Sequence, residues 1–309
     1  MQERMKARPP LYPGGNSATL LTVVASVFFA LVSGCQKPVV VPPITPTPTG
    51  KQLTGKFVWM DLVTGDVKAA RDFYGKLFGW QFEGEESKST PFTLVKQGGT
   101  PIAGIVYYEK MDPAQQQARW LSYLSVPDVD RASDIVRQSG GEIFVEPRDL
   151  PQRGRIAVVL DPQKVPFGLL KATGGDPTEE KVTPFRWMWH ELWTTDTTGA
   201  FLFYQKIFGY IKESMVLSVQ RGTYTILKTG DTPQAGMAQI IQEGVKPIWL
   251  PYVNVEDPAA IAVRTLTLGG KVLIAPSDSI RNGTVAIVAD PTGGIVAIQK
   301  WTPQDKLGK

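Results

Sequence analysis

Two acidic residues lie beside tryptophans at matching places in the chain. Asp61 follows Trp59 by two residues, and Glu191 stands two residues after Trp189 and two before Trp193. In a β-strand alternate residues share a face, so each acid and its tryptophans line the same side. Burial against aromatic rings raises a carboxyl pKa, which suits a general base or a hydrogen-bond donor. The two acids are therefore candidate catalytic residues, and the three tryptophans are candidate ligand-binding residues.

The same acids have a structural interpretation, in which each carboxylate pairs with a neighbouring Arg or Lys and holds parts of the protein together. His190, the only histidine, lies one residue from Trp189. Strand alternation points it to the opposite face, where it would pack in the core. With the register shifted by one residue, it would instead be a base or a single ligand. One histidine excludes any site that needs two imidazoles from one chain.

The segments that carry these residues belong to an internal repeat. The block from Trp59 to Gly79 recurs in the second half of the chain, from Trp189 to Gly209. In both copies a strand leads through an Asp into an amphipathic helix with the pattern Phe-Tyr-x-Lys-x-Phe, which a glycine ends. In the first copy the strand is predicted at 57–63 and the helix ends at Phe78, followed by three short strands.

A weaker repeat of the same order follows inside each half. It consists of a strand, a helix closed by Gly-Gly (128–139 and then 257–268), and three strands around an Asp-Pro step, and its markers keep a constant offset between the halves. Repeated units must bury the same faces. The chain is therefore predicted to hold two domains, residues 56–175 and 184–302, each made of two βαβββ units.

This combination of a strand, a Phe-Tyr and Phe-Gly helix, and Gly-Gly and Asp-Pro markers resembles the vicinal-oxygen-chelate superfamily, which includes glyoxalase I, bleomycin-resistance proteins and extradiol dioxygenases. The likeness is to its tandem glyoxalase-like branch and covers residues 56–173 and 184–302. It implies an α+β fold in which paired βαβββ units form curled mixed sheets, each with an open cleft. In metal-using members, each unit donates ligands from its first and last strands.

The positions at which this resemblance places metal ligands hold other residue types here. They fall on Trp59, Leu121, Gly168 and the Ala103-Gly104 step, and in the second half on Trp189, Leu250, Ala297 and Ala235-Gly236. None of these is His, Glu or Asp, whereas a divalent metal needs three or four converging N or O ligands. Neither a metal nor any other cofactor is predicted.

The N-terminus has the pattern of a bacterial lipoprotein. Basic residues precede an apolar run at 18–32, which is short for a bilayer-spanning helix and typical of a signal-peptide core. Val32-Ser33-Gly34-Cys35 resembles the lipobox, which implies a signal peptide at 1–34 and acylation of the Cys35 thiol. The alternative is an uncleaved anchor helix. The Pro/Thr-rich residues 35–55 are predicted to form a semi-rigid tether.

A lipid at Cys35 predicts a location in the cell envelope. The next residue is Gln, whereas an Asp there is usually linked to inner-membrane retention, so the outer membrane facing the periplasm is favoured. The formal charge of +4 falls to +2 without the first 34 residues, which hold three basic residues and one acid. No nucleic-acid partner is therefore predicted. The single cysteine allows no intrachain disulfide, and the oligomeric state is left open.

Three functions are compatible with these residues. The first is metal-independent binding of a small apolar or aromatic molecule in a Trp-lined cleft of a membrane-anchored protein. The second is a glyoxalase-type lyase or isomerase that uses Asp61 or Glu191 as its base. The third is a structural or non-catalytic interaction module of the cell envelope with no small-molecule ligand. The tryptophans that favour the first function also fit ordinary core packing.

Overall fold

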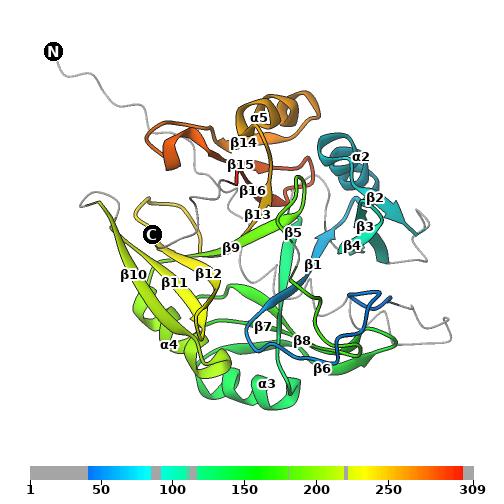
Figure 1. The fold of residues 1–309 in the computed structure, drawn as a ribbon, viewed down its shortest axis with the longest axis vertical. Helices are drawn as coiled ribbons and strands as arrows, with labels where there is room; N and C mark the ends of the chain where they lie inside the picture. Colours follow the sequence, from blue (N-terminus) through cyan, green and yellow to red (C-terminus); the bar gives the residue numbers. More distant parts are fainter. Residues whose placement is uncertain are drawn as a thin grey trace.

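Two eight-stranded mixed sheets, one from each half of the chain, form the framework of the protein (Figure 1). The computed structural model describes residues 41–84, 92–109, 111, 117–179, 181–218 and 222–301. The strands of the first sheet are β1 (Phe57–Thr64), β2 (Gln81–Glu83), β3 (Phe92–Gln97), β4 (Thr100–Tyr107), β5 (Arg119–Ser125), β6 (Glu142–Leu150), β7 (Gly154–Leu160) and β8 (Pro166–Ala172). Those of the second are β9 (Trp187–Thr194), β10 (Ile211–Ser218), β11 (Gly222–Thr229), β12 (Thr232–Gln239), β13 (Ile248–Asn254), β14 (Lys271–Ile274), β15 (Val285–Ala289) and β16 (Ile295–Gln299). The helices are α2 (Val67–Phe78), α3 (Val129–Gln138), α4 (Thr197–Phe208) and α5 (Pro258–Thr267), with a 3₁₀ turn at Arg281–Gly283.

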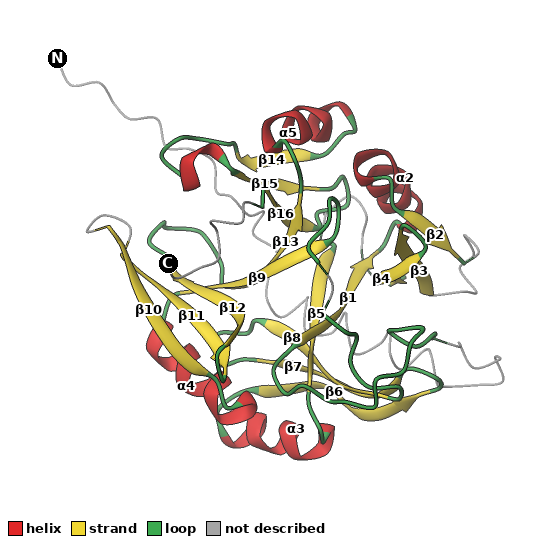
Figure 2. Ribbon diagram, in the orientation of Figure 1, coloured by secondary structure: helices red, strands yellow, loops and turns green. Residues whose placement is uncertain are grey.

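The strand order in both sheets is that of two βαβββ units joined side by side. It is β2-β3-β4-β1-β5-β8-β7-β6 in the first sheet and β10-β11-β12-β9-β13-β16-β15-β14 in the second. The units meet where β1 pairs antiparallel with β5, and β9 with β13. Within a unit the first strand runs parallel to the last, as β1 does to β4. In Figure 2 the helices lie in two pairs, at the top and at the bottom of the view, with strands between them. The predicted α+β fold of tandem, curled mixed sheets is confirmed.

The repeated helices α2 and α4 begin and end as their sequences predict. Asp66 and Asp196 each accept a hydrogen bond of 2.9 Å from the backbone N–H three residues further on. This bond satisfies one of the free donors of the first turn. Gly79 and Gly209 follow the last helical residues with φ angles of 71° and 70°, a left-handed conformation that costs glycine little.

Helix α2 joins the two domains through a buried hydrogen-bond chain. The Tyr74 hydroxyl donates to Asp290 of the second domain at 2.8 Å and accepts from Trp120 of its own domain at 2.9 Å. Asp290 also accepts from the backbone N–H groups of Thr292 and Gly294, at 2.6 and 3.2 Å, within its own Asp-Pro turn. The repeated tyrosine and the Asp-Pro marker therefore bind one domain to the other.

A second buried hydrogen-bond network repeats the first, with the roles of the two domains exchanged. Tyr204 of α4 donates to Asp161 at 3.1 Å and accepts from Trp249 at 2.8 Å. Burial raises the pKa of Asp161 to about 6, although its backbone and tyrosine donors oppose the rise. Helix α2 packs beside α5, and α3 beside α4. An approximate twofold axis therefore relates the two domains.

The back faces of the two first strands meet at this axis. His190 Nε2 lies 3.2 Å from the sulfur of Met60, which occupies the same place in the repeat. The imidazole stacks on Phe57 with the ring centroids 3.9 Å apart, and burial lowers its pKa to about 3. His190 is thus a neutral core residue between the domains, on the strand face opposite Trp189.

Residues 41–55 pack against the first domain. The backbone N–H of Gly50 donates to the Gly174 carbonyl at 3.0 Å. Val41 and Ile44 are 5% and 3% exposed and belong to a large apolar cluster that holds most of the buried apolar residues of this domain together with some of the other. Residues 41–55 are therefore packed on the protein, unlike the predicted extended tether. Burial of the apolar side chains between the prolines is favourable because it removes apolar surface from water.

The predicted signal peptide at 1–34 and the predicted lipidation site, Cys35, lie outside the described residues. In the ranges that the structure describes, every helix is too short or too polar to cross a bilayer.

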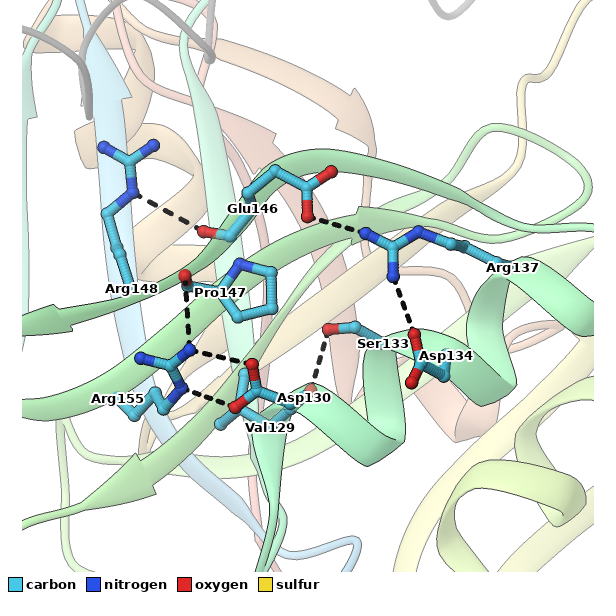
Figure 3. Close-up of polar contacts among 9 residues, drawn as sticks. All are labelled: Val129, Asp130, Ser133, Asp134, Arg137, Glu146, Pro147, Arg148 and Arg155. Atoms are coloured by element: carbon cyan, nitrogen blue, oxygen red, sulfur yellow. Dashed lines mark hydrogen bonds and ion pairs between the residues drawn. The ribbon is translucent and has the colours of Figure 1, made fainter.

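Surface ion pairs connect helix α3 with the hairpin β6–β7 (Figure 3). Arg155 of β7 holds Asp130 through Nε at 2.6 Å and Nη2 at 2.8 Å. Arg137 donates to Asp134 at 2.8 Å and to Glu146 of β6 at 2.6 Å. Because these carboxylates are largely exposed, each pair adds little to stability. These ion pairs connect surface elements and do not form a candidate functional site.

The Tyr74→Phe variant tests the bond between the domains. Removal of the hydroxyl takes one donor from buried Asp290, which keeps its backbone donors, and leaves the buried Trp120 N–H without its acceptor. The free energy of unfolding should therefore fall by about 1–3 kcal/mol. Urea denaturation of the purified chain measures the change. Tyr107→Phe, at a half-buried tyrosine of β4 outside this network, is the matched control. Equal effects of the two substitutions would contradict the assigned role of Tyr74.

Candidate functional site

The face of each sheet that is turned away from the helices carries the predicted site residues, and we call this face the cup. Leu124 of β5 packs with helix α3, whereas its neighbour Tyr123 points the other way. Directly paired residues of adjacent strands share a face. Tyr123 pairs with Trp59, and Asp61 pairs with Gly104, so these residues line cup 1. The matching residues that line cup 2 are Tyr252, Trp189, Glu191 and Gly236.

Glu191 is the centre of a hydrogen-bond network in cup 2. Its Oε1 accepts from Trp193 Nε1 at 2.7 Å and from the Tyr252 hydroxyl at 3.1 Å. Its Oε2 accepts from the Tyr224 hydroxyl at 2.9 Å and from Arg281 Nη2 at 2.6 Å. Four donors therefore surround a carboxylate that is only 4% exposed. Such charge-assisted bonds favour the ionised form.

The network lowers the pKa of Glu191, contrary to the raised value that burial against aromatic rings predicts. Burial does act to raise this pKa, but the charge of Arg281 and the hydrogen bonds from Trp193 and Tyr224 outweigh it. Glu191 is thus an ionised partner of Arg281, as in the structural interpretation of the acids. The sequence prediction failed because the compensating arginine is far away along the chain.

Cup 1 repeats this arrangement around Asp61. Trp59 Nε1 donates to Asp61 Oδ1 at 2.8 Å, and the guanidinium of Arg153 lies 4.1 Å from the centroid of the Trp59 ring. Burial raises the pKa of Asp61, while Arg153, Trp59 and Tyr123 oppose the rise. Burial also lowers the pKa of Arg153 to about 10. All four side chains are buried, so cup 1 is filled by its own residues.

Two glycines make room for these polar groups. A Cβ atom at Gly104 would collide with the Asp61 carboxylate, and one at Gly236 would collide with the Tyr224 hydroxyl. A side chain at either position would displace the group that it meets. The Ala-Gly step that recurs in the fourth strands is therefore a steric requirement of the two cups.

The tyrosine and arginine partners of both acids were not predicted from the sequence. Tyr123 and Tyr252 are separated by the same offset as the recognised repeat markers, so this spacing could have revealed them. Arg153 and Arg281 do not share that offset, and they stand in loops whose alignment between the halves is ambiguous. Arg281 has a φ angle of 46°, a strained conformation that tertiary contacts must hold in place.

An apolar pocket lies in cup 2 beside this network. Its walls include Trp193, Ile248, Leu250, Leu273, Ile287 and Ile295. The Trp193 ring lines the pocket while its Nε1 donates to the acid. Trp189 and Trp193 are half-buried, whereas Trp59 of cup 1 is 4% exposed and shares an apolar cluster with Val41 and Ile44. Cup 2 is therefore the more accessible of the two.

Comparisons with known proteins agree with this architecture. Residues 56–169 match the model of the Glyoxalase/Bleomycin resistance protein/Dioxygenase superfamily. A Mycobacterium bovis protein named "Putative glyoxylase CFP32" is 31% identical over 254 residues, which cover 80% of this chain and 95% of that protein. The "Anthracycline biosynthesis protein DnrV" of Streptomyces peucetius is 30% identical over 252 residues, which cover 77% of this chain and 90% of that protein.

A solved structure, the Mn(II)-bound glyoxalase from Novosphingobium aromaticivorans, has a similar fold. The TM-score is 0.55 with 13% sequence identity, and the match covers 84% of this chain and 92% of that one. At this level of identity the likeness concerns the fold alone.

The side chains in the two cups do not fit a divalent metal of the kind that this fold can hold. Within the described ranges, no three His, Cys, Asp or Glu residues are grouped so that they could bind one ion. Each cup offers one carboxylate, that of Asp61 or Glu191, and each carboxylate already has an arginine nearby. A metal ion needs several such donors at one point. The chemistry of the cups is therefore that of an acid, an arginine and aromatic rings.

The lowered pKa of Glu191 predicts how stability depends on pH. The stabilisation from a lowered carboxyl pKa is complete above the unfolded value, near 4.5, and is lost as the pH falls through the folded value. The Glu191→Gln substitution should therefore lower the free energy of unfolding by about 3–5 kcal/mol at pH 7, and this deficit should shrink below pH 4.5. Urea titrations between pH 3 and pH 7 measure it.

The control for this experiment is Glu213→Gln, which removes an exposed partner of Lys228 in the same domain and should change the free energy of unfolding by less than about 0.5 kcal/mol. A Glu191→Gln deficit that stays constant over the whole pH range would show that the carboxylate is not held ionised.

Proposed function

Since the chain belongs to the Glyoxalase/Bleomycin resistance protein/Dioxygenase superfamily, we propose that it binds a small apolar or aromatic molecule in cup 2. A fold does not determine a function, so the proposal depends on the residues of the site. The main support for this proposal is the apolar pocket of cup 2. Trp193, one of the residues that line it, donates a hydrogen bond of 2.7 Å to Glu191. Concave apolar pockets with a few fixed polar groups are typical of small-molecule sites.

Aromatic character in the ligand has two supports. The half-buried indoles of Trp189 and Trp193 offer ring faces and edges against which a planar molecule can pack. A relative named for anthracycline biosynthesis adds to this, since anthracyclines contain fused planar rings. The network around Glu191 would hold the indole of Trp193 in one orientation, so that little entropy is lost when a ligand binds.

Cup 1 is proposed to serve stability rather than binding. Its acid, Asp61, is 7% exposed and its arginine, Arg153, is 3% exposed. Val41 and Ile44 belong to the same apolar cluster as Trp59. A ligand in this cup would have to displace packed side chains, whereas cup 2 already has a partly open apolar pocket.

The lyase or isomerase alternative has weaker support. A general base must reach the proton that it removes. Glu191 already accepts four hydrogen bonds, and Asp61 lies in the filled cup. The third alternative, a non-catalytic envelope module, would leave the pocket of cup 2 without a ligand, so a binding measurement separates it from the main proposal.

We also propose that the protein is a lipoprotein anchored through Cys35 in the outer membrane, facing the periplasm. The apolar run at 18–32 and the lipobox-like residues that follow it support this. Cys35→Ser should abolish incorporation of labelled palmitate and shift the protein from the membrane fraction to the soluble fraction. Ser33→Ala, which keeps a small residue before the cysteine, should retain both. Unchanged labelling of Cys35→Ser would disprove the anchor.

Substitutions at one repeat position test the ligand site. Leu273 lines the pocket of cup 2, and Phe144 occupies the matching place of the repeat in domain 1. Leu273→Trp should fill the pocket and weaken binding of 2-naphthamide, a neutral aromatic probe, by at least about tenfold. Phe144→Trp should leave it unchanged. Calorimetry on the full-length chain in detergent, with micelle-only blanks, gives both constants, and equal binding by the two variants would place the site elsewhere.

A further inference from the structure

A second pocket lies on the approximate twofold axis, between the two domains. Its walls come in pairs that occupy matching places in the repeat, and these include Trp120 with Trp249, Pro166 with Ile295, and Arg119 with Ile248. Beside it, the backbone N–H of Ala118 donates to the Thr292 carbonyl of the other domain at 3.1 Å. Both domains therefore build the pocket, and a direct hydrogen bond holds its two sides together.

This axial pocket adjoins the pocket of cup 2. Ile248 and Ile295 line both of them. Both side chains are only half-buried, and Ile248 pairs with Trp193 across strands β9 and β13. A molecule that packs on Trp193 therefore lies next to Ile248, whose side chain also lines the axial pocket. A ligand that is longer than the first pocket would contact both pockets.

The charges along these two pockets have one sign. The charged residues that line them are Lys246 in the first pocket and Arg119 in the second, and none of the lining residues is Asp or Glu. Both cations already take part in other contacts of the protein, which a ligand would share or replace. At a concave apolar surface a cation attracts an anion more strongly than it does in open water.

The geometry points to one two-part site for an amphipathic organic anion, with its apolar or aromatic body in cup 2 and its acidic group at Arg119 in the axial pocket. The inference rests on the proposed function and names the ligand class for it. A carboxylate accepts charge-assisted hydrogen bonds from a guanidinium, often two in parallel. Domain 1 thereby supplies the residue that selects the ligand, although the apolar body is bound by domain 2.

Two probes that share one ring system test this assignment. 2-Naphthoate carries a carboxylate, and 2-naphthamide is its neutral analogue. The wild-type chain should bind the naphthoate more tightly, and Arg119→Gln should weaken naphthoate binding about tenfold while leaving naphthamide binding unchanged. Arg119→Lys should keep part of the preference. Arg131→Gln, at an exposed arginine of helix α3, is the matched control. Calorimetry on the full-length variants gives the ratio of the two constants.

The outcomes separate this inference from the function on which it rests. If Leu273→Trp weakens both probes but Arg119→Gln leaves their ratio unchanged, the ligand site stands and the anion assignment is overturned. If Arg119→Gln weakens both probes equally, Arg119 acts through shape and not charge, which overturns the assignment too. If Leu273→Trp changes neither constant, cup 2 is not the site and both proposals fail.

Discussion

The arrangement of the whole molecule depends on two buried tyrosine hydroxyls. Each hydroxyl lies between an indole of its own domain and a carboxylate of the other, as Tyr74 does between Trp120 and Asp290. The carboxylate also accepts from the backbone of the turn that precedes β16, so the last strand of one domain is positioned by a helix of the other. Loss of either hydroxyl would leave a buried indole N–H without its acceptor and would take one donor from a buried carboxylate of the other domain. Buried polar contacts therefore join the two domains in both directions.

The two cups show what duplication has kept and what it has changed. Both retain an acid, a tyrosine and an arginine, and both need a glycine to make room for polar groups. In cup 2 the acid bonds directly to Arg281, whereas in cup 1 the arginine lies over a tryptophan ring. Cup 1 is closed and cup 2 is partly open. Under the proposed function, the closed copy maintains stability and the partly open copy binds the ligand.

Local rules were enough to predict the fold and the faces of its strands. The repeat period, the Asp caps and the terminal glycines are determined by residues close together in the chain, and alternation placed Asp61 and Glu191 on the cup faces. The environment of each acid could not be predicted in this way. The pKa of Glu191 depends on Arg281, which a strained loop brings from a distant part of the chain. The burial of Val41 was missed for a similar reason, because its partners lie in distant strands.

The packing of residues 41–55 on domain 1 bears on how the protein would be held at a membrane. If Cys35 carries a lipid as proposed, six peptide steps separate it from buried Val41. Fully extended, they span about 20 Å at most. This connecting segment is much shorter than the tether that the proline-rich composition of residues 35–55 predicts. The folded part would then have a restricted set of orientations, with domain 1 close to the lipid surface. A ligand would have to enter cup 2 from a direction that the membrane does not block in these orientations.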